Sequence, residues 1–123
     1  ILVVLQTESP QGVENAEAIY SLPGCDAIFI GPNDLRFQMR AADGTFPTPE
    51  QHEAMIQRVI EVGKQLGTPT GIHAMDVPSA LERAEQGMQF LAIGSDLRLM
   101  TQQAQEVVKG LHPHDEAQDI ARY

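Results

Sequence analysis

The sequence lacks the features that mark several large classes of protein. It contains one cysteine, Cys25, so no internal disulfide framework can form, and with no secretory signal in view we expect a cytoplasmic protein. Its apolar runs, such as residues 1–5 and 90–93, are far shorter than the roughly 20 residues that cross a bilayer. We therefore expect no membrane partner.

Positive charge is also scarce. Eight lysines and arginines stand against seventeen acidic residues, which gives a net charge of −9. A nucleic-acid partner is not expected, because phosphate binding requires clustered basic side chains and these are scattered. The two lysines, Lys64 and Lys109, fall on expected helix surfaces, so covalent imine catalysis by this chain is not expected.

The chain has no initiating methionine and begins directly in an apolar run. We therefore expect it to be part of a longer protein. Its 42% hydrophobic and 20% charged residues are ordinary for a folded globular domain, so disorder is not expected.

Apolar runs and helical patterns alternate along the chain. The best-defined helix begins at Thr48, with Pro49 at its first position and Gln51 placed to close a capping box, and Gly67 ends it. A strand buried on both faces is expected at residues 1–5, and further apolar strands are expected at 26–30, 69–74 and 90–93. Further helices are expected at 13–22, 77–86 and 96–111, and a longer loop at 36–47 that allows a short helical turn at 36–39.

This alternation predicts the α/β class, with a parallel sheet and helices outside it. Four strand–helix units make half of an eightfold barrel, whose complete form takes about 250 residues. The pattern alone fits a small open four-stranded sheet equally well. We assign residues 1–111 to a half-barrel domain and residues 112–123 to a C-terminal tail or exchanged helix. Because half a barrel exposes apolar edges, we expect a homo-oligomer, domain swapping or dependence on a missing segment.

Two acidic residues follow the first two expected strands at equivalent positions, Glu8 after the first and Asp34 after the second. The carboxyl ends of parallel strands meet at one edge of a sheet, where the active sites of such folds gather. Two carboxylates there can bind a hard cation such as Mg²⁺ or Mn²⁺ and leave positions for water and a chelating substrate. The same residues also fit helix caps or solvated loop positions.

The segment before Asp34 favours a ligand site over a simple cap. This segment combines a flexible residue, Gly31, with a rigid turn at Pro32 and successive backbone N–H groups from Asn33 onward. Such a combination is suited to binding a substrate carboxylate. His73, near the end of the third expected strand, is a further candidate substrate contact, with a packed or solvated histidine as the alternative.

Other polar residues fit structural roles better. Ser95 and Asp96 are expected as helix caps. His112 and His114 lie near a helix end and a proline, where surface positions are expected rather than a metal pair. Cys25 precedes a strand, at the end away from the expected chemistry.

Two of these segments carry a resemblance to a known family. Residues 6–9, QTES, and residues 29–35, FIGPNDL, resemble the paired Q-x-E and F-I-G-P-x-D-L signatures of the HpcH/HpaI aldolase family, the class II pyruvate aldolases. The separation of 26 positions between Glu8 and Asp34 also fits that family. The resemblance covers residues 1 to about 110 and implies strands five to eight of a TIM-type (β/α)8 barrel.

The resemblance implies a metal-dependent carbon–carbon lyase that acts on a pyruvate-type 2-oxo acid and an aldehyde. Glu8 and Asp34 would ligate the cation, Mg²⁺, Mn²⁺ or Co²⁺. Gln6 would hydrogen-bond the 2-oxo acid or a metal-bound water, and the N–H groups of Asn33 and Asp34 would receive the pyruvate carboxylate. The cation would stabilise the enolate charge that forms on cleavage.

The same resemblance implies that catalytic groups are missing from this chain. The family takes its proton-transfer histidine and an arginine from the N-terminal half of the barrel, so no catalytic base is expected here and the fragment alone is expected to be inactive or incomplete. The family commonly has an apolar residue near His73, and this departure bears on the substrate. Two alternatives stay open: a citrate-lyase-like or malyl-CoA-lyase-like enzyme, and a non-catalytic barrel-derived binding module.

Overall fold

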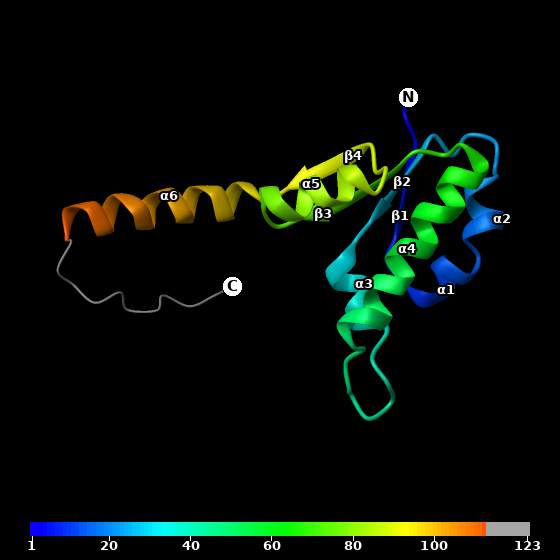
Figure 1. The fold of residues 1–123 in the computed structure, drawn as a ribbon, viewed down its shortest axis with the longest axis horizontal. Coiled ribbons are helices and arrows are strands. Elements are labelled where there is room, and N and C mark those ends of the chain that lie inside the picture. The colour runs from blue at the N-terminus through cyan, green and yellow to red at the C-terminus, as the bar shows by residue number, and fades with distance from the viewer. Residues whose placement is uncertain (113–123) are drawn as a thin grey trace. The chain divides into compact units, whose positions relative to one another are not determined.

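The computed structural model describes residues 1–112, which form four parallel strands and six helices (Figure 1). The elements are β1 (Val4–Thr7), α1 (Pro10–Glu14), α2 (Ala16–Tyr20), β2 (Ala27–Ile30), α3 (Pro32–Gln38), α4 (Pro49–Leu66), β3 (Thr70–Ala74), α5 (Val77–Glu85), β4 (Phe90–Ile93) and α6 (Asp96–Leu111). The chain divides into two compact units, and the boundary lies between Ile93 and Gly94.

The four strands lie in the sheet in chain order, β1-β2-β3-β4, and every neighbouring pair is parallel. One row across the sheet joins Gln6 to Phe29, Phe29 to Gly71 and Gly71 to Phe90. An open doubly wound sheet reverses its strand order at a switch point, whereas a barrel keeps the chain order. The order therefore favours a barrel segment, and the predicted parallel α/β class is confirmed. The assignment to strands five to eight stays a prediction.

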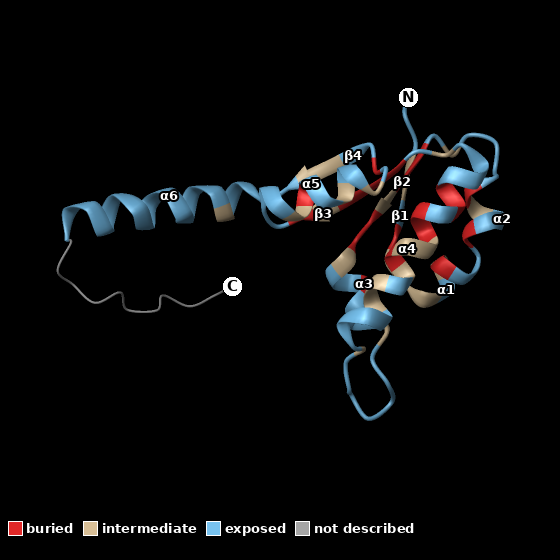
Figure 2. Cartoon of the chain, viewed as in Figure 1, coloured by how far each residue is buried: buried red, intermediate tan, exposed pale blue. Residues whose placement is uncertain are grey.

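The core lies on the face of the sheet that α1, α2 and α4 cover (Figure 2). Ile28 and Ile30 of β2 and Ile72 of β3 point to this face and are buried against α4 residues such as Val59 and Ile60. Alternate strand residues point to opposite faces, so this set of isoleucines lines one side. The apolar stripe that predicted α4 is therefore the stripe that covers the sheet.

The opposite face of the sheet is only partly covered. Gly71 lacks a side chain at the point where Phe90 of β4 crosses it, and a Cβ there would overlap the carbonyl oxygen of Phe90. The rings of Phe29 and Phe90 therefore meet across β3, with centroids 5.5 Å apart. Phe90 is half exposed, and every residue of the edge strand β4 is exposed or half-buried.

The first strand lies later in the chain than predicted, and the prediction that it is buried on both faces is wrong, since Val4 and Leu5 are half-buried and Gln6 is exposed. Residues 1–3 are exposed, and the backbone N–H of Val3 donates to the Asp26 carboxylate at 2.7 Å instead of entering the ladder. Pairing with β2 then runs from Val4 to Thr7. Thr7 is buried although it is polar, because its hydroxyl and that of Tyr20 are 2.9 Å apart and hydrogen-bonded.

The helix predicted over residues 13–22 is two short helices. Ser9 caps α1 by accepting from the Gly12 N–H at 3.1 Å, and Pro10 takes the first helical position, so this helix begins earlier than expected. Its interruption falls at Asn15, whose side-chain amide donates to the Gln11 carbonyl at 3.0 Å. Asparagine side chains compete with the helix backbone in this way.

The segment between β2 and α4 is also more helical than predicted. The expected turn at residues 31–34 and the helical turn expected at 36–39 join into one helix, α3, with Gly31 as its N-cap and Pro32 in its first turn. The prediction for α4 is confirmed. The Thr48 hydroxyl accepts from the Gln51 N–H, and the Gln51 side-chain oxygen accepts from the Thr48 N–H. Gly67, after the last turn, has a left-handed backbone with φ 71°. Asp76 caps α5 as predicted.

Helix α6 belongs to the second unit, and none of its described residues is buried within the chain. Its apolar residues, including Leu97, Met100 and Leu111, are all more than half exposed. Among residues 1–112, no helix is both long and apolar enough to cross a membrane. The predicted tail, apart from residue 112, lies outside the described residues, so the domain assignment of residues 112–123 stays a prediction.

Candidate active site at the carboxyl ends of the first two strands

The side chains of Gln6 and Glu8 come together over Gly31. The Gln6 amide Nε2 donates to Glu8 Oε2 at 2.8 Å. A Cβ placed on Gly31 would lie 2.8 Å from Glu8 Oε2 and 3.1 Å from Gln6 Nε2. Gly31 has φ −90°, which any residue adopts, so glycine provides space here rather than a special backbone conformation. The end of β1 thus presents an oriented carboxylate beside the start of α3.

Asp34 lies in the first turn of α3, which begins directly after Gly31. The helix rises about 1.5 Å per residue, so Asp34 follows the N-cap by roughly 4.5 Å along the axis. The first N–H groups of a helix have no acceptor within it, and here these include the N–H groups of Asn33 and Asp34. The structure therefore gathers Glu8, Asp34 and these N–H donors about the same end of one short helix.

The donor set at this end is small. Within residues 1–112, no group of three or more His, Cys, Asp or Glu side chains comes together as a metal site. Mg²⁺ characteristically binds through one or two protein carboxylates and keeps several waters, so a carboxylate pair with solvent access suits it better than Zn²⁺. Glu8 is half-buried and Asp34 is exposed, which leaves room for water and a ligand.

His52 holds the start of α3 in place. Its ring Nε2 lies 2.8 Å from the carbonyl oxygen of Pro32, and because a carbonyl only accepts, this nitrogen carries the proton. His52 is half-buried and comes from α4, twenty positions further along the chain. Sequence reasoning missed it, since a histidine in the first turn of an amphipathic helix gives no local signal of a distant partner.

A hollow of about 540 Å³ lies beside α3 and the loop that follows it. Asp34, Phe37 and Arg40 are in its wall, whereas Glu8 is not. The wall continues through Gln38, Ala41, Ala42 and Gly44. Asp34, in the first turn of the helix that begins after Gly31, thus borders an open space large enough for a small organic molecule.

His73 lies on β3 opposite Ala92 of β4. Strand alternation places it on the same face as Gly71, and hence on the face that carries Gln6. Two strand spacings, about 10 Å, separate β1 from β3, so the backbone of His73 is not adjacent to that of Glu8. Its position at the strand end agrees with the prediction, and its substrate contact stays a prediction.

The remaining candidates have the structural roles that were expected. Ser95 caps α6, because its hydroxyl accepts from the Arg98 N–H at 3.2 Å. His112 is exposed at the C-terminal end of α6, and His114 lies outside the described residues. Burial raises the pKa of the Cys25 thiol, and the neighbouring Asp26 charge adds to this rise, so the reactive thiolate is disfavoured. Lys64 and Lys109 are exposed on helices, as expected.

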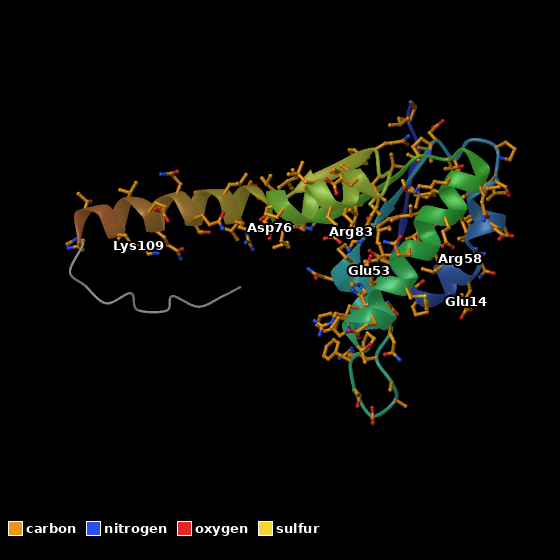
Figure 3. The ribbon with its side chains drawn as sticks, in the orientation of Figure 1. Glu14, Glu53, Arg58, Asp76, Arg83 and Lys109 are labelled. Carbon is orange, nitrogen blue, oxygen red and sulfur yellow. The ribbon has the colours of Figure 1, made fainter. Side chains whose placement is uncertain are left out.

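An ion pair outside the site joins the two helices that follow it. Glu53 of α4 and Arg83 of α5 point toward one another in Figure 3 and form two parallel hydrogen bonds, of 2.5 and 2.7 Å. The Arg83 guanidinium lowers the pKa of the Glu53 carboxyl, against a smaller opposing effect of burial. No sequence pattern indicated this pair, because its members are 30 positions apart.

Comparison with known proteins identifies the family of the chain. The family model described as HpcH/HpaI aldolase/citrate lyase matches residues 1–103. The chain is 38% identical over 108 residues to a hydroxypyruvate/pyruvate aldolase of Chromohalobacter salexigens, covering 88% of this chain and 42% of that protein. It is 37% identical over 107 residues to a 5-keto-4-deoxy-D-glucarate aldolase of an Enterobacter species, covering 87% of this chain and 41% of that protein.

Solved structures show the same fold. An HpcH/HpaI aldolase/citrate lyase family protein from Burkholderia cenocepacia superposes with a TM-score of 0.81 and 29% identity, over 91% of this chain and 43% of that one. The chain thus spans less than half the length of each of these three relatives.

Proposed function

Because this chain belongs to the HpcH/HpaI aldolase/citrate lyase family, we propose that it supplies the metal-binding carboxylates of a carbon–carbon lyase. The enzyme would cleave or form the bond between a pyruvate-type 2-oxo acid and an aldehyde. The observation that carries this proposal is the Glu8 carboxylate, which lies over Gly31 at the start of the helix that holds Asp34.

Glu8 and Asp34 are the residues that would hold the cation. The chemistry of the pair fits Mg²⁺ or Mn²⁺, with Co²⁺ as a further candidate, since these ions accept oxygen ligands. The space over Gly31 is the second indication of fit, because a side chain there would displace Glu8. When bound, the cation would act as a Lewis acid toward the charge that develops as a 2-oxo acid loses its carbon–carbon bond.

The residues around the pair bind and orient the 2-oxo acid. Gln6 fixes the Glu8 carboxylate through one amide hydrogen and has a second hydrogen for the 2-oxo oxygen or a water. The N–H groups of Asn33 and Asp34, at the positive end of α3, suit the pyruvate carboxylate. Pro32 begins the helix without an N–H of its own, and its carbonyl is held by His52.

The remaining catalytic groups would come from outside this chain. The family resemblance implies a proton-transfer histidine and an arginine from the other half of the barrel, and the relatives named as aldolases are more than twice as long as their matched segments. We propose that the complementary half of the barrel supplies them. The same half would cover the exposed sheet face that carries Phe90.

Metal binding to the chain itself tests the proposal. Calorimetric titration with Mn²⁺, alone and then with oxamate as a pyruvate analogue, should show one saturable site. Glu8→Gln and Asp34→Asn should each weaken Mn²⁺ binding by at least about 10-fold, since each removes one of two charged ligands. The matched control is Glu14→Gln on α1, an exposed carboxylate outside the Gln6–Glu8–Gly31 contact, which should bind as the unchanged chain does.

Two results would contradict the proposal. One is the absence of Mn²⁺ binding to a correctly folded chain, as judged by circular dichroism. The other is Mn²⁺ binding that survives both substitutions together, which would place the cation at other residues. Oxamate binding that needs no cation would instead favour a binding module without lyase chemistry.

A further inference from the structure

His73 lies in the same row of the sheet as Glu8. The strand pairing keeps one unbroken register across β1, β2 and β3, and one step beyond its last pairs it brings together Glu8, Gly31 and His73. Ala92 of β4 pairs with His73 and completes the row. Because alternate residues of a strand point to opposite faces, all four positions share the face that carries Gln6.

The Glu8 carboxylate reaches along this row toward the strand that carries His73. It lies over Gly31 of β2, since a Cβ there would stand 2.8 Å from Glu8 Oε2. One strand spacing, about 4.8 Å, separates β2 from β3. Gly31 has no side chain, so no side chain of this row stands between the carboxylate and His73.

The sheet below His73 is apolar. Gly71 lies two residues earlier on β3, and the rings of Phe29 and Phe90 meet across it with centroids 5.5 Å apart. His73 is half-buried beyond this aromatic pair. It therefore supplies a polar side chain from β3 at the level of Glu8. An imidazole hydrogen-bonds through two ring nitrogens, so it can keep a partner within the fold and still bind a ligand.

His73 does not complete the candidate cation site. Among residues 1–112, His, Cys, Asp and Glu side chains form no group of three that could hold a metal ion. A polar group one strand beyond the Glu8 carboxylate is instead placed to contact a molecule that is bound at Glu8 and extends toward β3.

We propose that His73 is a specificity-determining residue, whose imidazole hydrogen-bonds a hydroxyl group on carbon 3 of the bound 2-oxo acid. Carbon 3 is the first carbon beyond the carboxylate and the 2-oxo group, so its substituent is the nearest one that can reach a neighbouring strand. The preferred 2-oxo acid then carries a hydroxyl group at carbon 3. An alkyl group there would leave the half-buried imidazole without this hydrogen bond, which disfavours the alkyl analogue. The inference rests on the proposed lyase function, because that function places the 2-oxo acid at Glu8.

Calorimetry with Mn²⁺ and two 2-oxo acids of equal size tests the proposal. Hydroxypyruvate and 2-oxobutanoate differ in having a hydroxyl or a methyl group on carbon 3. The unchanged chain should bind hydroxypyruvate more tightly by about 3- to 10-fold, the contribution of one hydrogen bond. His73→Leu should abolish or reverse this preference, and His73→Gln, which keeps a hydrogen-bonding amide, should retain part of it. His112→Leu, at the end of α6, is the matched control and should keep the full preference.

Two further measurements separate a substrate contact from other roles of His73. With Mg²⁺ in place of Mn²⁺, the NMR resonances of the His73 ring should shift on addition of hydroxypyruvate and not of 2-oxobutanoate. Without any 2-oxo acid, His73→Leu should bind Mn²⁺ as the unchanged chain does. A weaker Mn²⁺ affinity in this variant would overturn the proposal, because His73 would then be a metal ligand.

The preference between the two acids decides the proposal. Equal binding of both by the unchanged chain would overturn it, as would a preference in His73→Leu as large as that of the unchanged chain. Mn²⁺-dependent oxamate binding without any preference between the acids would reject the role of His73 and leave the lyase proposal standing. Absence of Mn²⁺-dependent binding of either acid or of oxamate would reject both.

Discussion

The carboxylate of Glu8 occupies the space that a side chain on Gly31 would fill. A Cβ on Gly31 would stand 2.8 Å from Glu8 Oε2, closer than real Cβ atoms approach an oxygen. The contact joins the end of β1 to the N-cap of α3 and brings the first carboxylate to the helix that carries the second. The absence of a side chain at Gly31 is thus part of the site.

Gly31→Ala should weaken Mn²⁺ binding by about 10-fold or more, because the methyl group displaces Glu8 and the Gln6 amide that orients it. The backbone tolerates alanine at φ −90°, so the melting temperature should change little. Gly110→Ala is the control, since a Cβ there meets no other atom within 4 Å. Unchanged Mn²⁺ affinity in Gly31→Ala, measured by calorimetry, would mean that Glu8 is not a ligand.

His52 should act as a positioning residue for the first turn of α3. His52→Leu removes the donor to the Pro32 carbonyl and should lower Mn²⁺ affinity several-fold, with a loss of about 1 kcal/mol in the free energy of unfolding. His52→Gln retains an N–H donor and should recover part of the affinity. A purely structural role would show the loss of stability in His52→Leu with no change in affinity, and urea unfolding beside calorimetry separates the two.

The features that the sequence predicted are those set by local chemistry. Helix α4 was predictable because Thr48, Gln51 and Gly67 act within one turn of its ends. The parallel α/β class followed from alternating apolar runs and helical patterns. The two carboxylates of the candidate site could be assigned to one edge of the sheet because each follows an expected strand. The division of residues 13–22 was missed because Asn15 interrupts a pattern whose apolar spacing continues unbroken.

The contacts that complete the candidate site depend on strand register and helix packing. The place of Gln6 beside Glu8 could be guessed from their spacing, but their meeting over Gly31 requires β1 to pair with β2 in one register. The approach of His52 to Pro32 requires α4 to pack across α3. Neither interaction leaves a periodic signal, so sequence reasoning could name the carboxylates but not the residues that hold them.

The Glu53–Arg83 pair should make stability depend on pH in the acid range. The folded pKa of Glu53 lies below its unfolded value, which is about 4.3. The pair therefore stabilises the fold fully above about pH 4.5, and this contribution is lost as the pH falls through the folded pKa. Because Glu53 is 39% exposed, solvent screening limits the effect to about 1 kcal/mol or less.

Glu53→Gln should remove this part of the pH dependence. Urea unfolding of both proteins between pH 3 and 7 would show two curves that converge at low pH, with the unchanged chain more stable at neutral pH. Glu17→Gln, which affects the exposed pair with Arg58, should alter the curve less. A difference between Glu53→Gln and the unchanged chain that stays constant across this range would contradict the assignment.

Removing one partner of the buried hydrogen bond between Thr7 and Tyr20 should destabilise the fold more than removing both partners. Tyr20→Phe leaves the Thr7 hydroxyl buried without its partner and should cost about 1–3 kcal/mol in the free energy of unfolding. Thr7→Val in the Tyr20→Phe background replaces the stranded hydroxyl with a methyl group of similar size and should recover much of that loss. A double-mutant cycle in urea measures the coupling. Strictly additive losses would mean that the two hydroxyls contribute independently, and that packing alone buries the end of β1 against α2.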